Sequence, residues 1–173
     1  MQSNKKIWVD LGCGKAKPEG YFGIDLRKMV GVDHVMDLGK DKLPFEDDSV
    51  DLLRALHILE HFYPEQLFYC MEECWRVLKP KGKIHIQVPK AGTHAYYLNP
   101  DHKIQFVEDT FGFFQVPGNP ERIDPYGYLK GFWHVCILES PHDQHIILDM
   151  YPNKPNGRFD YVEVVVDKVV KSS

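Results

Sequence analysis

The chain has 173 residues, of which 43% are hydrophobic and 27% are charged, and this balance predicts one soluble globular domain over residues 1–173. Its net charge of -4 argues against a surface that tracks nucleic-acid phosphates, because such surfaces concentrate lysine and arginine. No CxxC pair is present, so zinc-ribbon and thioredoxin-like sites are not indicated. We find neither a signal peptide nor an apolar run of membrane-spanning length, and we expect a cytoplasmic protein without a membrane partner.

The amino-terminal part of the chain predicts a series of short strands. Each is an apolar run rich in β-branched or aromatic residues, and each stops at glycines, acids or a polar turn. The first ends at a glycine-rich turn, and the fourth follows an acidic turn. These strands are expected at Ile7–Leu11, Tyr21–Leu26, Asp33–Leu38 and Ser49–Leu56.

A helix is expected next, at Pro64–Leu78, because apolar residues recur there at helical spacing. Proline suits its first turn, and Lys79–Gly82 should end it because proline and glycine cannot continue a helix. Lys83–Val88 alternates in polarity and predicts a fifth strand. Later elements are expected as a short helix at Val107–Phe114, strands at Trp133–Leu138 and His145–Met150, and an edge strand within Tyr161–Val170.

Strands joined by crossovers, with a helix before the fifth strand, predict an α/β fold. We expect a doubly wound, mostly parallel sheet with an antiparallel strand near the C-terminus. Sheets of this kind bind ligands outside the carboxyl ends of their strands, near the point where the strand order reverses. The polar motifs described below fall at such strand ends, which favours a ligand site along this edge.

A glycine-rich turn, Asp10–Gly14 (DLGCG), closes the first predicted strand. Glycines let the backbone turn tightly and approach a ligand without an intervening Cβ, although an ordinary tight turn is an equal alternative. A dinucleotide fingerprint would need a third glycine where Lys17 stands, and the chain contains no GxxxxGK[ST] phosphate loop. The turn therefore does not fit NAD or ATP.

Two acids end the next two predicted strands. Asp25 could accept hydrogen bonds from both hydroxyls of a ribose. Asp37 could accept a hydrogen bond from an adenine amino group, with Leu26 and Leu38 packed on the ring. Each acid alone is also compatible with a solvated strand end, and their order along the chain favours the ligand-binding interpretation.

These residues resemble the class I S-adenosylmethionine-dependent methyltransferases. The resemblance runs from Ile7 to Pro89 and points to a small single-domain member of the type 11 kind. It implies a Rossmann-like methyltransferase fold, S-adenosyl-L-methionine as cofactor and methyl transfer as activity. Its motifs, in family order, are Val9–Gly14, Gly23–Leu26, Leu43–Asp51, Leu59–Phe62 and Arg76–Lys83.

The resemblance also implies a role for each strand end. The first loop would surround the methionine part of the cofactor, mostly through its backbone, and the acid after the second strand would hold the ribose. Residues ending the third strand would flank the adenine, and the tip of the fourth would lie near the sulfonium and the substrate entrance. The expected cofactor-binding residues are Asp10, Gly12, Cys13, Gly14, Asp25, Leu26, Asp37, Leu38, Leu56 and His57.

Two features depart from the family pattern. Only Lys15–Gly20 separates the loop from the second strand, where the family usually places a full helix, and a stable helix needs more residues. One face of the sheet is therefore expected to be thinly covered, which favours a partner subunit such as a second copy in a homodimer. Ala16 replaces a frequent third glycine, which affects the expected geometry of the loop.

The candidate catalytic residues are His57, Glu60 and His61. Methyl transfer from a sulfonium is a direct displacement that needs alignment in a dry site, and needs a base only when the nucleophile carries a proton. Imidazole accepts a proton near neutral pH. In a helical turn, the three- and four-residue spacings would place all three side chains on one face.

The same trio has two other interpretations. Glu60 and His61 could merely orient the backbone and cap a helix. Imidazole and carboxylate groups are also suitable ligands for a divalent metal. Some similar methyltransferases carry a Glu-x-x-Glu-His metal set at this place, with His57 standing here for the first Glu. The sequence assigns no metal ligand, and it leaves His102 as a secondary candidate in the loop after the fifth strand.

The acceptor is expected to be a small molecule or a sugar-like compound, methylated on an O, N or C atom. Aromatic residues are frequent in Thr93–Trp133, and pockets for small molecules are often lined by such side chains, although ordinary core packing explains each one equally well. A nucleic-acid methyltransferase is the alternative, but Ala55–Ile58 lacks the Asn/Asp-Pro-Pro-aromatic turn typical of base amino methylation. A binding module without turnover is a third hypothesis.

Overall fold

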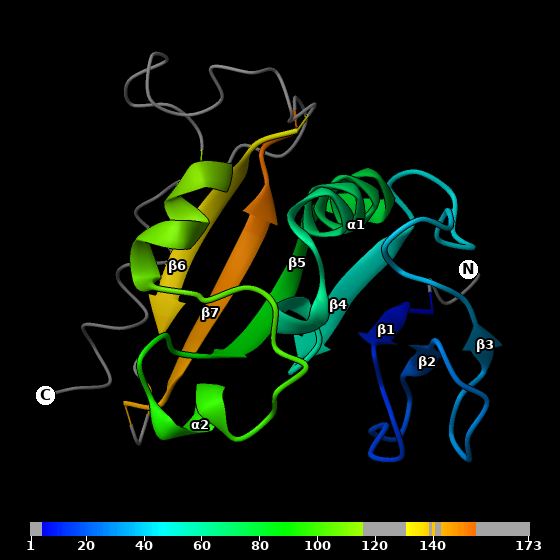
Figure 1. The fold of residues 1–173 in the computed structure, drawn as a ribbon. Helices are drawn as coiled ribbons and strands as arrows, with labels where there is room; N and C mark the ends of the chain where they lie inside the picture. The colour runs from blue at the N-terminus through cyan, green and yellow to red at the C-terminus, as the bar shows by residue number, and fades with distance from the viewer. Residues whose placement is uncertain (1–4, 116–130, 139, 141–142, 155–173) are drawn as a thin grey trace, which may run out of the picture.

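The computed structural model describes residues 5–115, 131–138, 140 and 143–154 (Figure 1). Its strands form one seven-stranded sheet in the order β3-β2-β1-β4-β5-β7-β6. Strands β1 to β5 are parallel to one another, and β7 is antiparallel to both β5 and β6, so the expected mostly parallel α/β sheet is confirmed. The strands are β1 (Trp8–Leu11), β2 (Phe22–Asp25), β3 (His34–Val35), β4 (Val50–Leu56), β5 (Leu78–Pro89), β6 (Trp133–Leu138) and β7 (His145–Pro152).

The described helices fill the crossovers on the β4 side of the sheet. Helix α1 connects β4 to β5, as its apolar spacing predicts, and the remaining helical elements are short. None of the helices in the described part of the chain is long and apolar enough to cross a lipid bilayer. The helices are η1 (Leu59–His61), α1 (Pro64–Val77), α2 (His94–Tyr97) and η2 (Glu108–Phe114).

The boundary between α1 and β5 differs from the prediction. The helix ends at Val77, and β5 starts at Leu78 without an intervening loop, so Lys79–Gly82 belongs to the strand. Leu78 pairs with Val50, and the next paired residue, Lys83, lies opposite Leu52, which makes this segment a bulge. A bulge tolerates proline and glycine, because a residue outside the ladder needs no backbone hydrogen bond there.

Other differences are smaller. The third strand is shorter than predicted, helix α2 was not anticipated, and the helix expected at Val107–Phe114 is the 3-10 helix η2. Strands β6 and β7 lie at the predicted places, with β7 extended to Pro152. The edge strand predicted within Tyr161–Val170 lies outside the described residues.

One face of the sheet carries the hydrophobic core. Alternate residues of the central strands point to this face and are fully buried, for example Val9, Leu53, Ile84 and Leu148. Helix α1 packs its apolar side onto them, and Phe68 of this helix contacts both Phe113 and Phe114 in η2. Figure 1 shows α1 and η2 in front of the sheet. Both elements therefore cover the same face.

The opposite face carries a polar row across neighbouring strands, because side chains alternate along each strand. Asp10, Arg54, His85 and Asp149 are successive register partners from β1 to β7. Arg54 donates to Asp10 at 2.9 Å, and His85 Nδ1 lies 2.7 Å from a carboxylate oxygen of Asp149. The His85 side chain is 33% exposed, so this face is less covered than the core face. A partner subunit on it stays a prediction.

The two acids of this row, Asp10 and Asp149, have pKa values shifted in opposite directions. Burial is the largest influence on each, and it raises the pKa of Asp10 even though Arg54 acts against it. At Asp149, hydrogen bonds from His85 and Lys83 outweigh burial, and the pKa lies below its ordinary value. The row is therefore held by ion pairs across the strands.

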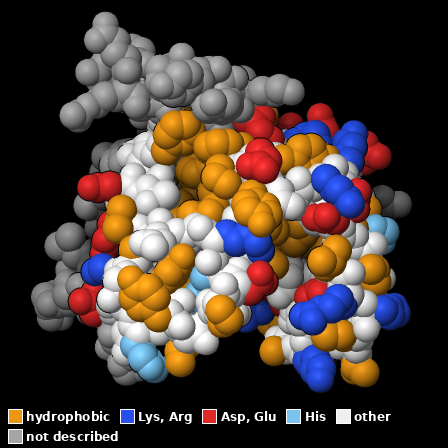
Figure 2. All heavy atoms as spheres, in the orientation of Figure 1, with side chains coloured by type: hydrophobic (Ala, Val, Ile, Leu, Met, Phe, Trp, Pro, Cys, Tyr) orange, Lys and Arg blue, Asp and Glu red, His pale blue; other side chains and the backbone are white. Residues whose placement is uncertain are grey.

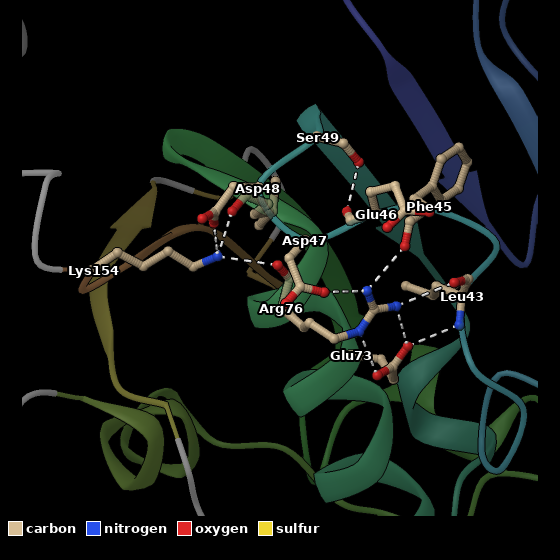
Figure 3. Close-up of polar contacts among 10 residues, drawn as sticks. Leu43, Phe45, Glu46, Asp47, Asp48, Ser49, Glu73, Arg76 and Lys154 are labelled. Carbon is tan, nitrogen blue, oxygen red and sulfur yellow. Dashed lines mark hydrogen bonds and ion pairs between the residues drawn. The ribbon is translucent and has the colours of Figure 1, made fainter.

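Arg76, near the end of α1, fastens the chain segment before β4 (Figure 3). Its guanidinium donates to Glu73 at 2.7 Å, to Asp47 at 2.8 Å, and to the backbone carbonyls of Phe45 and Leu43 at 2.9 and 3.1 Å. Burial alone would raise the pKa of Glu73, but hydrogen bonds from Arg76 and the Leu43 amide lower it. We call these contacts, together with those of Lys154 described next, the amino-edge clamp.

Lys154 follows β7 and completes the clamp. Its ammonium group donates to Asp48 and to the backbone carbonyls of Arg76 and Leu78, the latter at 2.7 Å. The same group lies 4.5 Å from the centre of the Trp75 ring, within the range of a cation–π contact. The clamp therefore joins the amino ends of β4 and β5 to the end of β7, at the edge opposite the strand tips discussed below.

We predict that Arg76→Ala lowers the free energy of unfolding by about 2–4 kcal/mol, because it leaves Glu73 and two backbone carbonyls without their shared donor. Urea denaturation followed by circular dichroism measures the change. Arg27→Ala is the matched control, since Arg27 is exposed and its loss should cost less than about 0.5 kcal/mol. Equal stability of the two variants would contradict the structural role of the clamp.

Candidate functional site

The candidate site lies where the carboxyl ends of β1, β2 and β4 meet. These strands are parallel neighbours, with β1 in the middle, so the loops that follow them share one edge of the sheet. The strand order reverses here, because the chain moves outward from β1 to β3 and then crosses to β4 on the other side. In Figure 2 the surface is notched at this edge, between the α2 side and the loops after β1 and β2.

The glycine-rich turn has the backbone conformation that its sequence predicts. Gly12 and Gly14 have φ angles of 65° and 53°, in the region that favours glycine. A Cβ on Gly12 would lie 2.7 Å from the Ile58 side chain, whereas a Cβ on Gly14 would meet open space. Gly12 is therefore required for packing, and Gly14 leaves the backbone bare on the open side of the turn.

Asp25 ends β2 and connects it to this turn. One carboxylate oxygen accepts the Gly14 amide at 2.9 Å, and the other accepts the Arg27 amide at 3.0 Å. A carboxylate offers about four acceptor sites, so further hydrogen bonds to a ligand are available. The next residue, Leu26, is 63% exposed, which leaves an apolar side chain uncovered beside the acid.

Asp37 and Leu38 follow β3 and lie in different surroundings. Asp37 accepts the Gly39 amide at 3.0 Å and is within 3.4 Å of the Lys40 ammonium group. Its side chain is 25% exposed and accessible from solvent. Leu38 is buried in the core, so its contact with an adenine stays a prediction.

Two residues of the turn have their side chains engaged within the fold. Asp10 lies on β1 and pairs with Arg54 in the polar row. Cys13 is buried, and burial together with the nearby carboxylates of Asp10 and Asp25 raises the pKa of its thiol. The thiol therefore stays protonated at neutral pH and is a packing group, and any contact of these residues with a ligand is left to the backbone.

His57 comes directly after Leu56 at the tip of β4, with a φ angle of 55°. A non-glycine residue in this conformation is strained, and such strain concentrates at functional sites. Its amide donates to the Gln87 carbonyl of β5 at 2.9 Å, and its ring is half-exposed. The backbone is thus held against β5, while the imidazole remains accessible to solvent.

The imidazole of His57 is oriented from both ends. The amide nitrogen of Gln87 lies 3.1 Å from Nε2, and because an amide nitrogen can only donate, Nε2 is the acceptor. Nδ1 therefore carries the proton, and it lies 3.4 Å from a carboxylate oxygen of Glu60. The ring also meets that of His145, with 5.0 Å between their centres. Neither Gln87 nor His145 carries a sequence spacing that singles it out.

Glu60 and His61 occupy the 3-10 turn η1 after this strand tip. Glu60 is fully buried, and its carbonyl accepts the amides of Lys103 and Ile104, which hold the turn against the segment after α2. His61 lies on the other side of Glu60, where its ring meets that of His102 with centres 4.9 Å apart. Of the predicted trio, His57 and Glu60 therefore contact each other, and His61 follows Glu60 in the turn with its ring against His102.

The aromatic residues expected to line a pocket divide into two groups. Phe106, Phe111, Phe114 and Trp133 are fully buried in the core, so for these residues the packing interpretation is correct. Tyr97 is 66% exposed beside the strand tips. Residues 116–130 lie outside the described part of the chain.

Comparisons with known proteins agree with this arrangement. The model of the family described as "Methyltransferase domain" matches residues 27–86. A probable S-adenosylmethionine-dependent methyltransferase from Mycolicibacterium smegmatis is 27% identical over 184 residues, covering 82% of this chain and 69% of the relative.

Solved structures share the fold. A SAM dependent methyltransferase from Archaeoglobus fulgidus has a TM-score of 0.61 at 18% identity, covering 84% of this chain and 86% of the other. The complex of DhpI with SAH has a TM-score of 0.58 at 12% identity, covering 87% of this chain and 78% of the other.

We predict that Gly12→Ala destabilises the protein by about 1–3 kcal/mol, because it adds a Cβ both to a left-handed backbone and against Ile58. Gly14→Ala is the matched control, since it shares the positive φ and lacks the steric contact. Thermal unfolding compares the two variants. Adding Ile58→Ala to Gly12→Ala should recover part of the loss, and a purely additive result would contradict the packing argument.

Proposed function

We propose that this chain, which is similar to S-adenosylmethionine-dependent methyltransferases in sequence and fold, is a class I methyltransferase that methylates an O, N or C atom of a small-molecule or sugar-like acceptor. The observation that carries the proposal is the half-exposed His57, held at the strand tip between Gln87 and Glu60. A base at this place suits an acceptor that carries a proton.

The turn after β1 and the acid after β2 fit the cofactor. The bare backbone at Gly14 leaves room where a side chain would otherwise stand, and Asp25 has acceptor capacity left for the ribose hydroxyls. The exposed Leu26 offers an apolar surface for the adenine. We propose that Gly12, Gly14, Asp25 and Leu26 make the principal contacts, with Asp10, Cys13, Asp37, Leu38, Leu56 and His57 around them.

S-adenosylmethionine, when bound, supplies an electrophilic methyl group on a sulfonium whose departure leaves a neutral thioether. In the proposed reaction, a lone pair of the acceptor forms a bond to the methyl carbon as the carbon–sulfur bond breaks. His57 Nε2 receives the acceptor's proton, taking up the lone pair to which Gln87 donates in the free protein. Glu60, facing Nδ1, orients the ring and stabilises the imidazolium that forms. His61 lies beside Glu60 and supports its position.

We predict that S-adenosylhomocysteine binds with a dissociation constant in the micromolar range, and that Asp25→Ala weakens it at least about tenfold, or about 1.4 kcal/mol. The variant loses the ribose acceptor together with the anchor of the Gly14 amide. Isothermal titration calorimetry measures both affinities. Asp109→Ala, at an exposed acid of η2, should bind like the wild type, and unchanged affinity in Asp25→Ala would remove the ribose assignment.

The acid–base role has a separate test. His57→Ala should lower kcat about 100-fold or more with an acceptor found by screening hydroxyl and amine compounds, because general-base catalysis contributes roughly that much. Release of S-adenosylhomocysteine reports turnover, and calorimetry should show cofactor affinity close to that of the wild type. Full turnover in this variant would return His57 to a purely structural role.

A nucleic-acid acceptor is separated from a small molecule by the same assay. Activity on RNA or DNA that falls steeply with added salt would point to phosphate contacts and overturn the small-molecule proposal. If the protein binds S-adenosylhomocysteine but turns over none of these acceptors, the result would favour a binding module without catalytic activity.

A further inference from the structure

The carboxylate of Glu60 has no hydrogen-bond partner for either oxygen within the described residues, and it is fully buried. Desolvating a charged group without compensation is costly, and buried polar groups are paired in the great majority of cases. His57 Nδ1 lies 3.4 Å from Oε1 of Glu60, and this long contact offsets only a small part of the cost of burying the charge. A positively charged ligand bound to Glu60 would account for a buried carboxylate without hydrogen bonds.

Two further imidazoles, those of His61 and His102, lie close to this carboxylate. Glu60, His61 and His102 each present one ligand atom, and these atoms lie within 4.8 Å of one another. His102 Nε2 is 3.8 Å from a carboxylate oxygen of Glu60, which is too long for a hydrogen bond. The three ligand atoms are therefore close together, and Glu60 and His102 form no direct hydrogen bond. A cation bound between them requires this spacing.

Both imidazoles are already oriented through their other nitrogen. His102 Nδ1 lies 2.7 Å from the backbone carbonyl of Tyr96, so this nitrogen donates and Nε2 keeps its lone pair. His61 Nδ1 lies 3.3 Å from a carboxylate oxygen of Asp101, which favours the same tautomer. Metal-binding histidines almost always have such a carbonyl or carboxylate partner, because it fixes the ring and raises the basicity of the ligating nitrogen.

The ammonium group of Lys103 lies beside this cluster but does not donate to the Glu60 carboxylate. Lys103 directs its ammonium group to the His61 carbonyl at 2.9 Å and to Asp101 at 3.1 Å. Its charge is thus matched by Asp101 at the rim of the cluster. The carboxylate of Glu60 remains without that donor.

We propose that Glu60, His61 and His102 form a binding site for one divalent transition-metal cation, of which Zn²⁺ is the best suited. One carboxylate oxygen and the two Nε2 atoms supply three ligands. Two imidazoles with one carboxylate match catalytic zinc sites, which keep a further position open for water or substrate. The buried carboxylate then acquires a positive partner, which the described residues do not supply.

The role of this cation rests on the proposed function, whereas its binding does not. Such a cation would lie near His57, whose Nδ1 is 3.4 Å from a carboxylate oxygen of Glu60. A hydroxyl oxygen of the acceptor that occupied the open coordination position would lose its proton more readily, because a bound cation lowers the pKa of its ligand. The site therefore favours an acceptor hydroxyl.

Titration of the full chain, freed of metal with EDTA and dialysed, tests the site. Zn²⁺ followed by calorimetry should bind with one cation per chain, and Co²⁺ should give visible absorption bands that Zn²⁺ displaces. We expect His102→Ala to lose at least about 100-fold in Zn²⁺ affinity, since it removes a ligand, and Asp101→Asn to lose about tenfold as an outer partner. His34→Ala, on the edge strand β3, is the matched control and should bind like the wild type.

Glu60→Gln separates a metal ligand from a structural acid. This change keeps the shape and removes the unpaired charge, so in EDTA the variant should unfold at the wild-type temperature or above it. Zn²⁺ should raise the unfolding temperature of the wild type and leave that of Glu60→Gln unchanged. If this variant does not fold, His102→Ala carries the same comparison.

The outcomes are distinct from those of the proposed function. Equal Zn²⁺ affinity in the wild type and in both ligand variants, or no binding to the wild type, overturns the metal site. If S-adenosylhomocysteine still binds in that case, the methyltransferase proposal stands. If Zn²⁺ binds as predicted but the wild type does not bind S-adenosylhomocysteine, the metal site stands and the proposed function fails.

Discussion

The close approach of Gly12 to Ile58 joins the loop after β1 to the segment after β4. This contact needs a glycine twice, because the backbone has a positive φ and because a Cβ would collide with Ile58. The residue before Ile58 is His57, which is itself in a left-handed conformation. The proposed cofactor loop and the candidate base are therefore both next to this one packing contact.

The two edges of the sheet have different physical characters. At the amino edge, Arg76 and Lys154 are satisfied by carboxylates and backbone carbonyls, and the network holds strands and helix together. At the carboxyl edge, glycine backbone, an exposed leucine and a buried carboxylate remain without equivalent partners in the described part of the chain. Within the described residues, the amino edge is therefore held by a satisfied charge network, whereas the buried carboxylate of Glu60 at the carboxyl edge has no hydrogen-bond partner.

Much of this arrangement could be predicted from local sequence. The glycine-rich turn, the acid ending β2 and the positions of the strands followed from short apolar runs that stop at defined residues, since strand ends and turns depend on near neighbours. The helix at α1 followed from spacing alone. The bulge at Lys79–Gly82 did not, because proline and glycine end a helix equally well whether a loop or an irregular strand comes next.

The candidate site was less predictable because its contacts connect distant residues. His102 meets His61 and Glu60 only after the chain has formed β5 and α2, and no spacing reveals that return. The orientation of His57 by Gln87 depends on strand register. Helical spacing placed His57, Glu60 and His61 on one face, whereas the 3-10 turn leaves Glu60 between His57 and the His61–His102 pair.

The central claim is that the tips of β1, β2 and β4 together bind the cofactor. Titration of isotope-labelled protein with S-adenosylhomocysteine, followed by amide chemical shifts, tests it most directly. The account predicts that the amides of Gly12, Gly14, Leu26 and His57 shift together along one binding curve, while those of Ser49 and Arg76 stay in place. Shifts confined to the amino edge, or to the polar row on the open face, would contradict it.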